Sequence, residues 1–258
     1  NTEPPNNNDG ADNEPQEDNR FAEIKEVKQL TAPLPDVELI TDFKQIKDHI
    51  QYDGTIYIDV EADVETQQPI LLALYQKHWK KVYAVDLRKV KLEQVKEWLL
   101  RFNVISGWGL NYDLVRLGFS YEELKDHVVL DLLLLAREKL YKRDSFKLDD
   151  VLKDVLGVEY PFDKTKIRKT FKNTLYFTQE QLQYVGLDVY YLPKLFDAIS
   201  DDSLSIVQQL DQEALKVCVD TSQRGMPFLV EEARAKLIVL RQELDVITKE
   251  LGFNPRSP

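Results

Sequence analysis

The fold expected for this chain is decided by the stretch Thr55-Ile-Tyr-Ile-Asp59-Val-Glu61. Its isoleucines, Ile56 and Ile58, are β-branched and favour a strand. Residues two apart in a strand lie on the same face, so Asp59 and Glu61 are expected to project together from the strand's carboxyl end. Two adjacent carboxylates repel each other unless a cation lies between them. The stretch therefore predicts a buried strand that ends in a cation site.

Composition limits the class of protein. The chain has 258 residues, of which 43% are hydrophobic, enough for one good-sized core. A formal net charge of -11 argues against a polybasic binder, although a local basic patch can still hold nucleic acid. A single cysteine, Cys218, excludes an intramolecular disulfide framework and a cysteine-rich zinc site. No apolar run reaches membrane-spanning length, so we expect a cytoplasmic, monomeric protein that does not contact a membrane.

The domain organisation follows from changes in composition along the chain. Residues 1–36 are rich in Asn, Pro, Asp and Glu and are expected to form a disordered acidic tail or linker. Residues 37–200 are expected to form one α/β domain. Residues 201–258 are expected to be a helical segment, in which a long amphipathic helix over 230–251 ends at Gly252.

A mixed sheet is expected inside the α/β domain. Apolar runs over 69–75 and 82–86 follow the central strand with short links, which predicts an antiparallel meander. A short strand over 104–106 comes next, and strands alternating with helices indicate a mixed-sheet α/β fold. Thr41 is expected to cap a helix over 42–50. The later helices are expected over residues 91–102, 111–117, 121–125, 129–140, 147–156, 178–186 and 188–199.

Two further acids stand where a site could form. Asp113 follows a glycine-containing turn and lies in the first turn of a helix, which places it at the mouth of the sheet. Taken alone, an Asp there more often serves the helix start than a ligand. Tyr184 and Asp188 are four residues apart and so share one helix face. Taken alone, this pair is more often a surface Asp beside a half-buried Tyr.

The three motifs in this order resemble the DEDD exonucleases of the tyrosine subclass, which have a ribonuclease H-like fold. The resemblance is to the proofreading 3′–5′ exonuclease domain of family A (Pol I type) DNA polymerases. It spans roughly residues 37–258. It extends to VVLDLLLLA (128–136), which resembles that domain's buried helix beginning with an Asp, here Asp131, and to KLDDVLKDVLGVE (147–159). RGMPFLVEEA (224–233) and LGFNPRSP (251–258) resemble the segment that leads into the polymerase domain of the same parent chain.

The resemblance implies a role for each matched residue. Asp59, Glu61, Asp113 and Asp188 would hold two divalent ions, Mg²⁺ or Mn²⁺, which prefer hard oxygen ligands. Tyr184 would orient the attacking water for two-metal-ion hydrolysis of a phosphodiester at the 3′ end of single-stranded or frayed DNA. Arg143 stands where the family has an arginine near the substrate phosphate. Four further residues are expected to bind substrate: Asn111 and, in the basic run, Lys164, Lys166 and Arg168.

The sequence also departs from the family pattern. The usual Asn four residues before Asp113 is replaced by Gly109, and Asn111 lies in a different register. Asp63 and Glu65 form a second Asp-x-Glu, but they fall in a polar loop rather than at the end of an apolar strand. The three histidines lie outside all motifs, which argues against a histidine-based nuclease.

Other interpretations remain open for the whole chain. One is a ribonuclease D-like enzyme that trims RNA from the 3′ end with the same site. Another is a nucleic-acid-binding module with weak catalysis, although all four carboxylates are present. A complete polymerase is excluded because the chain contains no polymerase motif. The basic run from Lys164 to Lys172, with Phe171 and Tyr176, is either a strand-guiding loop or a solvated surface loop.

Overall fold

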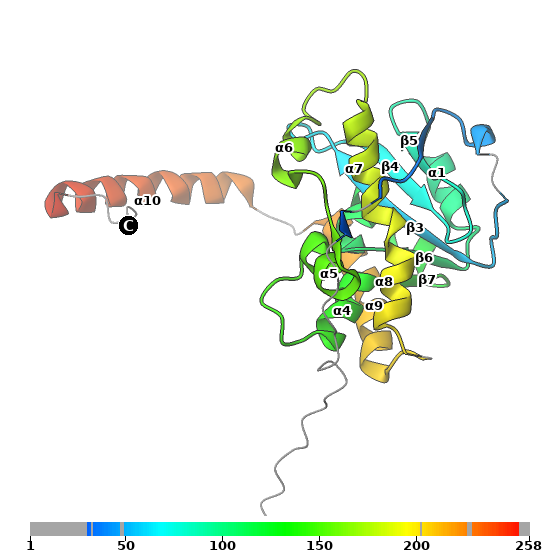
Figure 1. Ribbon diagram of the computed structural model, residues 1–258. Coiled ribbons are helices and arrows are strands. Elements are labelled where there is room, and N and C mark those ends of the chain that lie inside the picture. Colours follow the sequence, from blue (N-terminus) through cyan, green and yellow to red (C-terminus); the bar gives the residue numbers. More distant parts are fainter. Residues whose placement is uncertain (1–29, 32, 47–48, 202, 226–228, 253–258) are drawn as a thin grey trace, which may run out of the picture.

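A six-stranded mixed sheet forms the centre of the fold (Figure 1). The computed structural model describes residues 30–31, 33–46, 49–201, 203–225 and 229–252. The strands lie in the order β2 (Val37–Ile40), β5 (Val82–Asp86), β4 (Pro69–Tyr75), β3 (Thr55–Ala62), β6 (Val104–Gly107) and β7 (Val128–Asp131). β3, β4 and β5 pair antiparallel, whereas β2 with β5, β3 with β6, and β6 with β7 pair parallel. The expected meander followed by parallel strands is confirmed.

The helices cover this sheet. α7 packs against four of its strands, β2, β3, β4 and β5, and Figure 1 shows it running across them, continued by α8. Residues 71–74 in β4 are fully buried, as an apolar run covered on both faces should be. The helices are α1 (Leu92–Leu99), α2 (Leu110–Arg116), α3 (Tyr121–Leu124), α4 (Leu132–Lys139), α5 (Leu148–Leu156), α6 (Lys164–Lys169), α7 (Gln179–Tyr190), α8 (Leu192–Ile199), α9 (Ile206–Arg224) and α10 (Val230–Leu251).

Two segments differ from the sequence-based expectation. The helix expected over 129–140 is divided: Val128–Asp131 is a strand, and only Leu132–Lys139 is helical. A continuous apolar run has no period that separates strand from helix. In the helix expected over 42–50, a short 3₁₀ turn, Phe43–Gln45, is present, and residues 47–48 lie outside the described residues. Its N-cap is Asp42 rather than Thr41, because the Asp42 carboxylate accepts a hydrogen bond from the Lys44 amide at 3.0 Å.

α7 is one continuous helix rather than two. The break expected after residue 186 falls instead at Tyr191, between α7 and α8. A capping box starts α7: the Thr178 hydroxyl accepts from the Gln181 amide, and the Gln181 side chain accepts from the Thr178 amide. Tyr184 and Asp188 therefore lie one turn apart on the same helix.

The folded part begins before residue 37. A two-residue strand, β1 (Leu30–Thr31), pairs parallel with β8 (Val158–Glu159). Pro35 is buried, and a Cβ placed on Gly186 of α7 would lie 2.5 Å from Val37 Cγ2 and 3.3 Å from Pro35 Cγ. The boundary expected at 36/37 therefore falls inside a segment that packs on the domain. Residues 1–29, the rest of the expected tail, lie outside the described residues.

α9 belongs to the same folded unit as the sheet. It packs against α2, α3, α4 and β7. The Gln212 side chain accepts from the Asp131 amide at 2.7 Å and donates to the Asp131 carbonyl at 3.1 Å, as a neighbouring strand would. The apolar residues Val207, Leu210 and Val217 of this helix are exposed. The domain thus extends beyond the boundary expected at residue 200.

α10 confirms the expected long helix over 230–251 and ends at Gly252, whose φ of 73° suits a left-handed cap. None of its residues is buried, and Figure 1 shows it projecting away from the sheet. Within the described ranges, no helix combines the length and the apolar character needed to cross a membrane.

Candidate functional site

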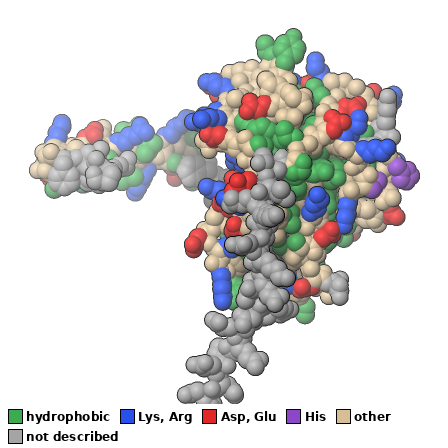
Figure 2. All heavy atoms as spheres, viewed as in Figure 1, with side chains coloured by type: hydrophobic (Ala, Val, Ile, Leu, Met, Phe, Trp, Pro, Cys, Tyr) green, Lys and Arg blue, Asp and Glu red, His purple; other side chains and the backbone are tan. Residues whose placement is uncertain are grey.

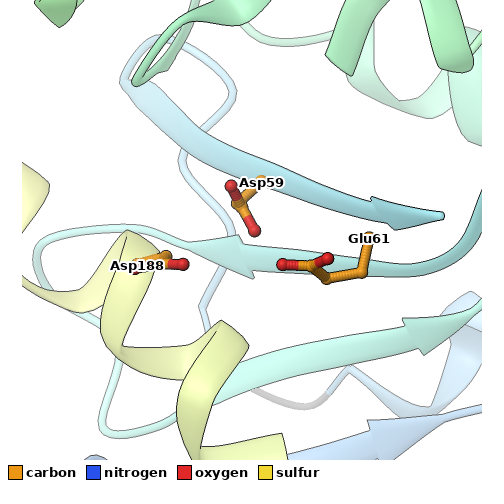
Figure 3. Close-up of side chains that lie close together, drawn as sticks. All are labelled: Asp59, Glu61 and Asp188. Carbon is orange, nitrogen blue, oxygen red and sulfur yellow. The ribbon is translucent and has the colours of Figure 1, made fainter. Parts of the chain in front are cut away.

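Three carboxylates converge from β3 and α7 (Figure 3). Asp59 and Glu61 lie on the central strand, between β4 and β6, and Asp188 projects toward them from α7. One carboxylate oxygen from each residue lies within 4.8 Å of the others, a spacing that could hold a metal ion. We call Asp59, Glu61 and Asp188 the carboxylate cluster. Glu61 and Asp188 are 127 residues apart in sequence. The fold brings Asp188 to the two acids of β3 because α7 packs across that strand.

Burial and mutual repulsion disfavour ionisation in the cluster. Burial, and then the negative charge of Asp188, raise the pKa of Asp59 to about 7, against the opposing effect of Lys164 and Arg168. The pKa of Glu61 is raised well above its ordinary value by burial and by the charges of Asp59 and Asp188. Asp59 Oδ2 is buried and has no hydrogen-bond partner among the described residues. Hard oxygen donors with an unpartnered buried acceptor fit a divalent cation, which would relieve both effects.

Asp113 lies beside the cluster and contacts the central strand. Its Oδ1 accepts a hydrogen bond from the Val60 amide at 2.8 Å. Burial, followed by the charge of Asp59, raises its pKa well above the ordinary value. The alternative role, at the start of α2, is not what the structure shows, since the N-cap there is Gly109 with no side-chain cap. Asp113 therefore stands next to Asp59, on the neighbouring element α2.

The start of α2 is held by Asp131 instead. Asp131 ends β7 and caps α4, where its Oδ1 accepts from the Leu133 amide. The same carboxylate accepts from the Gly109 and Leu110 amides, each at 2.9 Å. Gly109 has φ of 76°, which favours glycine. Asp131 is thus a buried brace for the turn that carries Asp113.

Basic and phenolic groups from 160–168 face the cluster. Lys164 Nζ lies 2.8 Å from Asp188 Oδ1, and the Tyr160 hydroxyl donates to the same oxygen at 2.8 Å. Arg168 is exposed as a residue, but its Nε reaches inward and donates to the Tyr184 hydroxyl at 2.9 Å. Asp163 caps α6 by accepting from the Lys166 amide, which sets Lys164 and Arg168 one turn apart on this helix.

Tyr184 is fully buried, and its hydroxyl faces the acids. Burial and the charges of Asp188 and Glu61 raise its pKa above the ordinary value, so the phenol stays protonated. Burial lowers the pKa of Arg168, but Tyr184, Glu61 and Asp188 outweigh that effect, so its pKa is raised and the guanidinium stays charged. A neutral phenol held by a fixed cation is the state in which Tyr184 can donate a hydrogen bond.

The remaining expected residues have other contacts. Arg143 pairs with Asp154 at 2.5 Å and donates to the Ser145 carbonyl at 3.1 Å. Lys166 has a side chain 83% exposed and lies 3.4 Å from Asp163. Asn111 Oδ1 is buried without a hydrogen-bond partner among the described residues.

The second Asp-x-Glu belongs to a loop. Asp63 accepts hydrogen bonds from the Thr66 and Asn173 amides, at 2.8 and 2.6 Å, and these contacts, the Thr66 amide first, lower its pKa. Glu65 pairs with Lys172 at 2.7 Å. Asp63 therefore fastens the loop after β3 to the segment between α6 and α7 and is saturated with donors.

That segment shows a mixed surface. Phe171, expected near the substrate, is buried in the core, whereas Tyr176 is 86% exposed. Figure 2 shows hydrophobic side chains projecting at the top of the molecule, and Lys and Arg side chains dispersed among Asp and Glu elsewhere on this face. The visible face has no single extended basic surface, so positive charge next to the cluster comes from individual residues such as Lys164 and Arg168.

Tyr160 was not predicted from the sequence. It follows β8 and reaches a carboxylate 28 residues further along the chain. No local pattern marks it, because a single Tyr after a two-residue strand has neither periodicity nor spacing to a motif. In the sequence, the only notable feature of Tyr160 is that it lies four residues before the basic run that begins at Lys164.

The comparisons with known proteins support the fold. No family model matches the sequence, and no curated protein matches it. Among solved structures, RNase D from Trypanosoma brucei in complex with RNA U12 is similar with a TM-score of 0.57 and 16% identity, covering 76% of this chain and 73% of that chain. NrnC from Brucella melitensis gives 0.52 and 12%, covering 73% and 92%. Its complex with pGG gives 0.50 and 13%, covering 74% and 91%. The expected ribonuclease H-like mixed sheet is thereby confirmed.

Proposed function

We propose that this chain is a metal-dependent 3′–5′ exonuclease acting on single-stranded nucleic acid. The carboxylate cluster carries the proposal: three acids from β3 and α7 converge, and one buried oxygen of Asp59 has no hydrogen-bond partner in the part of the chain that the structure describes. Tyr184, one helical turn before Asp188, adds a protonated phenol to the same site. Acids without a nearby histidine, together with a buried tyrosine, suit phosphodiester hydrolysis with divalent ions better than nucleophilic or histidine-based chemistry.

The positions of the four carboxylates indicate which of them would bind each metal ion. Asp59, Glu61 and Asp188 would hold one Mg²⁺ or Mn²⁺, and Asp59 with Asp113 would hold the second. Bound there, the ions would supply a nucleophilic water at neutral pH and would neutralise charge on the phosphate. The octahedral preference of Mg²⁺ leaves coordination sites for water and phosphate oxygens beside the protein carboxylates.

The chain's own residues would then orient the reaction. Arg168 holds the Tyr184 hydroxyl from one side, so that the hydroxyl can direct a water for in-line attack. Lys164 and Arg168 bring two positive charges to a largely acidic molecule, where they would attract the phosphate of the terminal nucleotide. Asp113, tied to the Val60 amide, is held in place relative to Asp59.

The substrate we favour is the 3′ end of single-stranded RNA or of a short oligonucleotide. Two of the similar structures are an RNase D with RNA U12 and NrnC with pGG, and this is the support for an RNA-trimming role. A proofreading role beside a polymerase domain rests only on the sequence resemblance, namely the motif order and the segments 224–233 and 251–258. Recessed carboxylates need a frayed or single-stranded end, because a duplex end cannot bring its terminal phosphate to them.

A matched-strand assay tests the proposal. RNA and DNA single strands of one sequence, each labelled at the 5′ end, are incubated with the protein and Mg²⁺ or Mn²⁺. We expect a ladder shortened from the 3′ end, faster on RNA, and abolished by Asp59→Asn. The matched control is Glu65→Gln, which removes an acid from the second Asp-x-Glu and should leave the ladder intact.

Each other outcome has a distinct meaning. A faster ladder on DNA would replace the RNA-trimming role by the proofreading one, with the site unchanged. Binding of either strand without cleavage would indicate a binding module. Full activity of Asp59→Asn would place the chemistry elsewhere and overturn the proposed site.

A further inference from the structure

Tyr160 occupies a specific place beside the carboxylate cluster. It directly follows β8, which pairs with β1, so its backbone is held by a small second sheet rather than by the main one. Its hydroxyl lies 2.8 Å from Asp188 Oδ1. Lys164 Nζ lies 4.2 Å from the centre of the Tyr160 ring and 2.8 Å from the same carboxylate oxygen. Tyr160, Lys164 and Asp188 thus form a closed triangle of contacts.

Both donors act on one oxygen of Asp188. The Tyr160 hydroxyl donates to this oxygen at 2.8 Å, and the Lys164 ammonium lies at the same distance from it. Within the described part of the chain, both hydrogen bonds that Asp188 accepts end on Oδ1. A carboxylate whose one oxygen is held by two donors has a fixed plane, and its other oxygen remains free to bind a cation.

We infer that Tyr160 is a positioning residue that fixes the Asp188 carboxylate in the orientation needed to bind a divalent ion. The inference rests on the proposed function, since it assigns Asp188 to a metal. Tyr160 itself would touch neither the ion nor the substrate. Groups that orient metal-ligating carboxylates through hydrogen bonds commonly change metal affinity about 10- to 100-fold when removed.

The ring and the hydroxyl have separable roles. The ring supports the Lys164 ammonium through a cation–π contact, and the hydroxyl holds Asp188. Tyr160→Phe removes only the hydroxyl, so it leaves the support for Lys164 in place. The matched control is Tyr191→Phe, which also removes one buried phenol hydroxyl, here one that lies 3.4 Å from the Pro33 carbonyl.

The test measures metal binding without nucleic acid. Mn²⁺ is titrated into the full chain and followed by electron paramagnetic resonance or calorimetry, and unfolding is recorded in EDTA to confirm that the variants fold. We expect Tyr160→Phe to bind Mn²⁺ about 10-fold more weakly, while Tyr191→Phe binds as the wild type does. In the strand assay, kcat should fall for Tyr160→Phe with KM for the 3′ end unchanged, and higher Mn²⁺ should restore the rate.

The outcomes separate this inference from the proposed function. Equal Mn²⁺ affinity for wild type and Tyr160→Phe, with cleavage intact in both, would overturn the role of Tyr160 and leave the exonuclease proposal standing. The same loss in Tyr191→Phe would show a general packing effect and would also overturn it. A wild-type chain that binds no Mn²⁺ and cleaves neither strand would overturn both.

Discussion

Arg168 Nε lies 2.9 Å from the hydroxyl of Tyr184, so a cation from α6 fixes a phenol on α7. Arg168 lies on α6 and Tyr184 on α7, so this hydrogen bond joins the two helices at the site. Under the proposed function Tyr184 directs a water, and this role would depend on the contact with Arg168, because small displacements of a catalytic group have large effects on rate.

Replacing Arg168 tests this relationship. In Arg168→Met the Tyr184 hydroxyl loses its donor, and we expect kcat on a single strand to fall about 10- to 100-fold. The control is Lys166→Met on the same helix, which removes an exposed cation and should change kcat little. Equal losses in both variants would show that general positive charge, and not the bond to Tyr184, matters.

Neutralising Asp59 should separate activity from stability. Its carboxylate is buried beside Glu61 and Asp188, and its Oδ2 accepts no hydrogen bond from any described residue, so Asp59→Asn relieves repulsion in the metal-free protein. We expect cleavage to be lost while the melting temperature in EDTA rises. Thermal unfolding followed by circular dichroism measures the second effect. A melting temperature below that of wild type would mean that attraction to Lys164 and Arg168 outweighs the repulsion.

The pH dependence has a defined sign. The pKa of Asp59 is raised to about 7 in the folded chain, above its ordinary value of 3.8. The folded state therefore holds this proton more tightly than the unfolded state does, and its stabilising effect is complete below about pH 4 and lost as the pH rises through 7. In EDTA, the melting temperature of wild type relative to Asp59→Asn should fall steadily between these values. A constant difference would contradict the raised pKa.

Metal binding should show the complementary trend. Ligand carboxylates must lose their protons to bind a cation, so protons compete with Mg²⁺ at the raised pKa of Asp59. We expect Mg²⁺ to raise the melting temperature more at pH 8 than at pH 5.5. The same titration on Asp59→Asn supplies the control, in which the Mg²⁺ effect should be largely absent at both values.

Gly186 links the amino-terminal segment to the site. An alanine Cβ there would lie 2.5 Å from Val37 Cγ2, so β2 or α7 must move. We expect Gly186→Ala to reduce the free energy of unfolding by about 1–3 kcal/mol and to lower activity, because Tyr184 and Asp188 flank it on α7. Val37→Ala removes the clashing methyl groups, so the double variant should recover part of both losses. Simple additivity of the two changes would contradict a direct clash.

Much of the fold could be predicted because strong local patterns coincide with it. The alternation that ends in Asp59 and Glu61, and the apolar runs of β4 and β5, each have a period or length typical of a strand. β7 was missed because residues 128–136 form one apolar run with an Asp inside it, which suits a helix equally well. The way α9 packs on the sheet could not be predicted, because Gln208 and Gln212, which are buried, look like surface residues in sequence.

The candidate site, like the fold, could be predicted only in part. The order of acids suggested which carboxylates would meet, but their meeting depends on how α7 crosses β3, which no local pattern specifies. From the sequence, the basic run was either a strand-guiding loop or a solvated surface loop. In the structure Lys164 instead contacts Asp188, and Arg168 contacts Tyr184. Arg143 was expected near substrate and pairs with Asp154, a contact that sequence spacing could not indicate.

The side-chain amide of Gln212 forms hydrogen bonds with both the N–H and the C=O of Asp131, in the edge strand β7. A seventh strand would otherwise have to pair with these two groups. A fragment that stops at residue 200 would leave those groups bare on a strand with open hydrogen-bonding capacity, and bare rims recruit strands from other molecules. Such a shortened protein should self-associate, and the same cut would loosen the acid that braces the turn carrying Asp113. The smallest piece that keeps the fold around the candidate site therefore runs through Arg224.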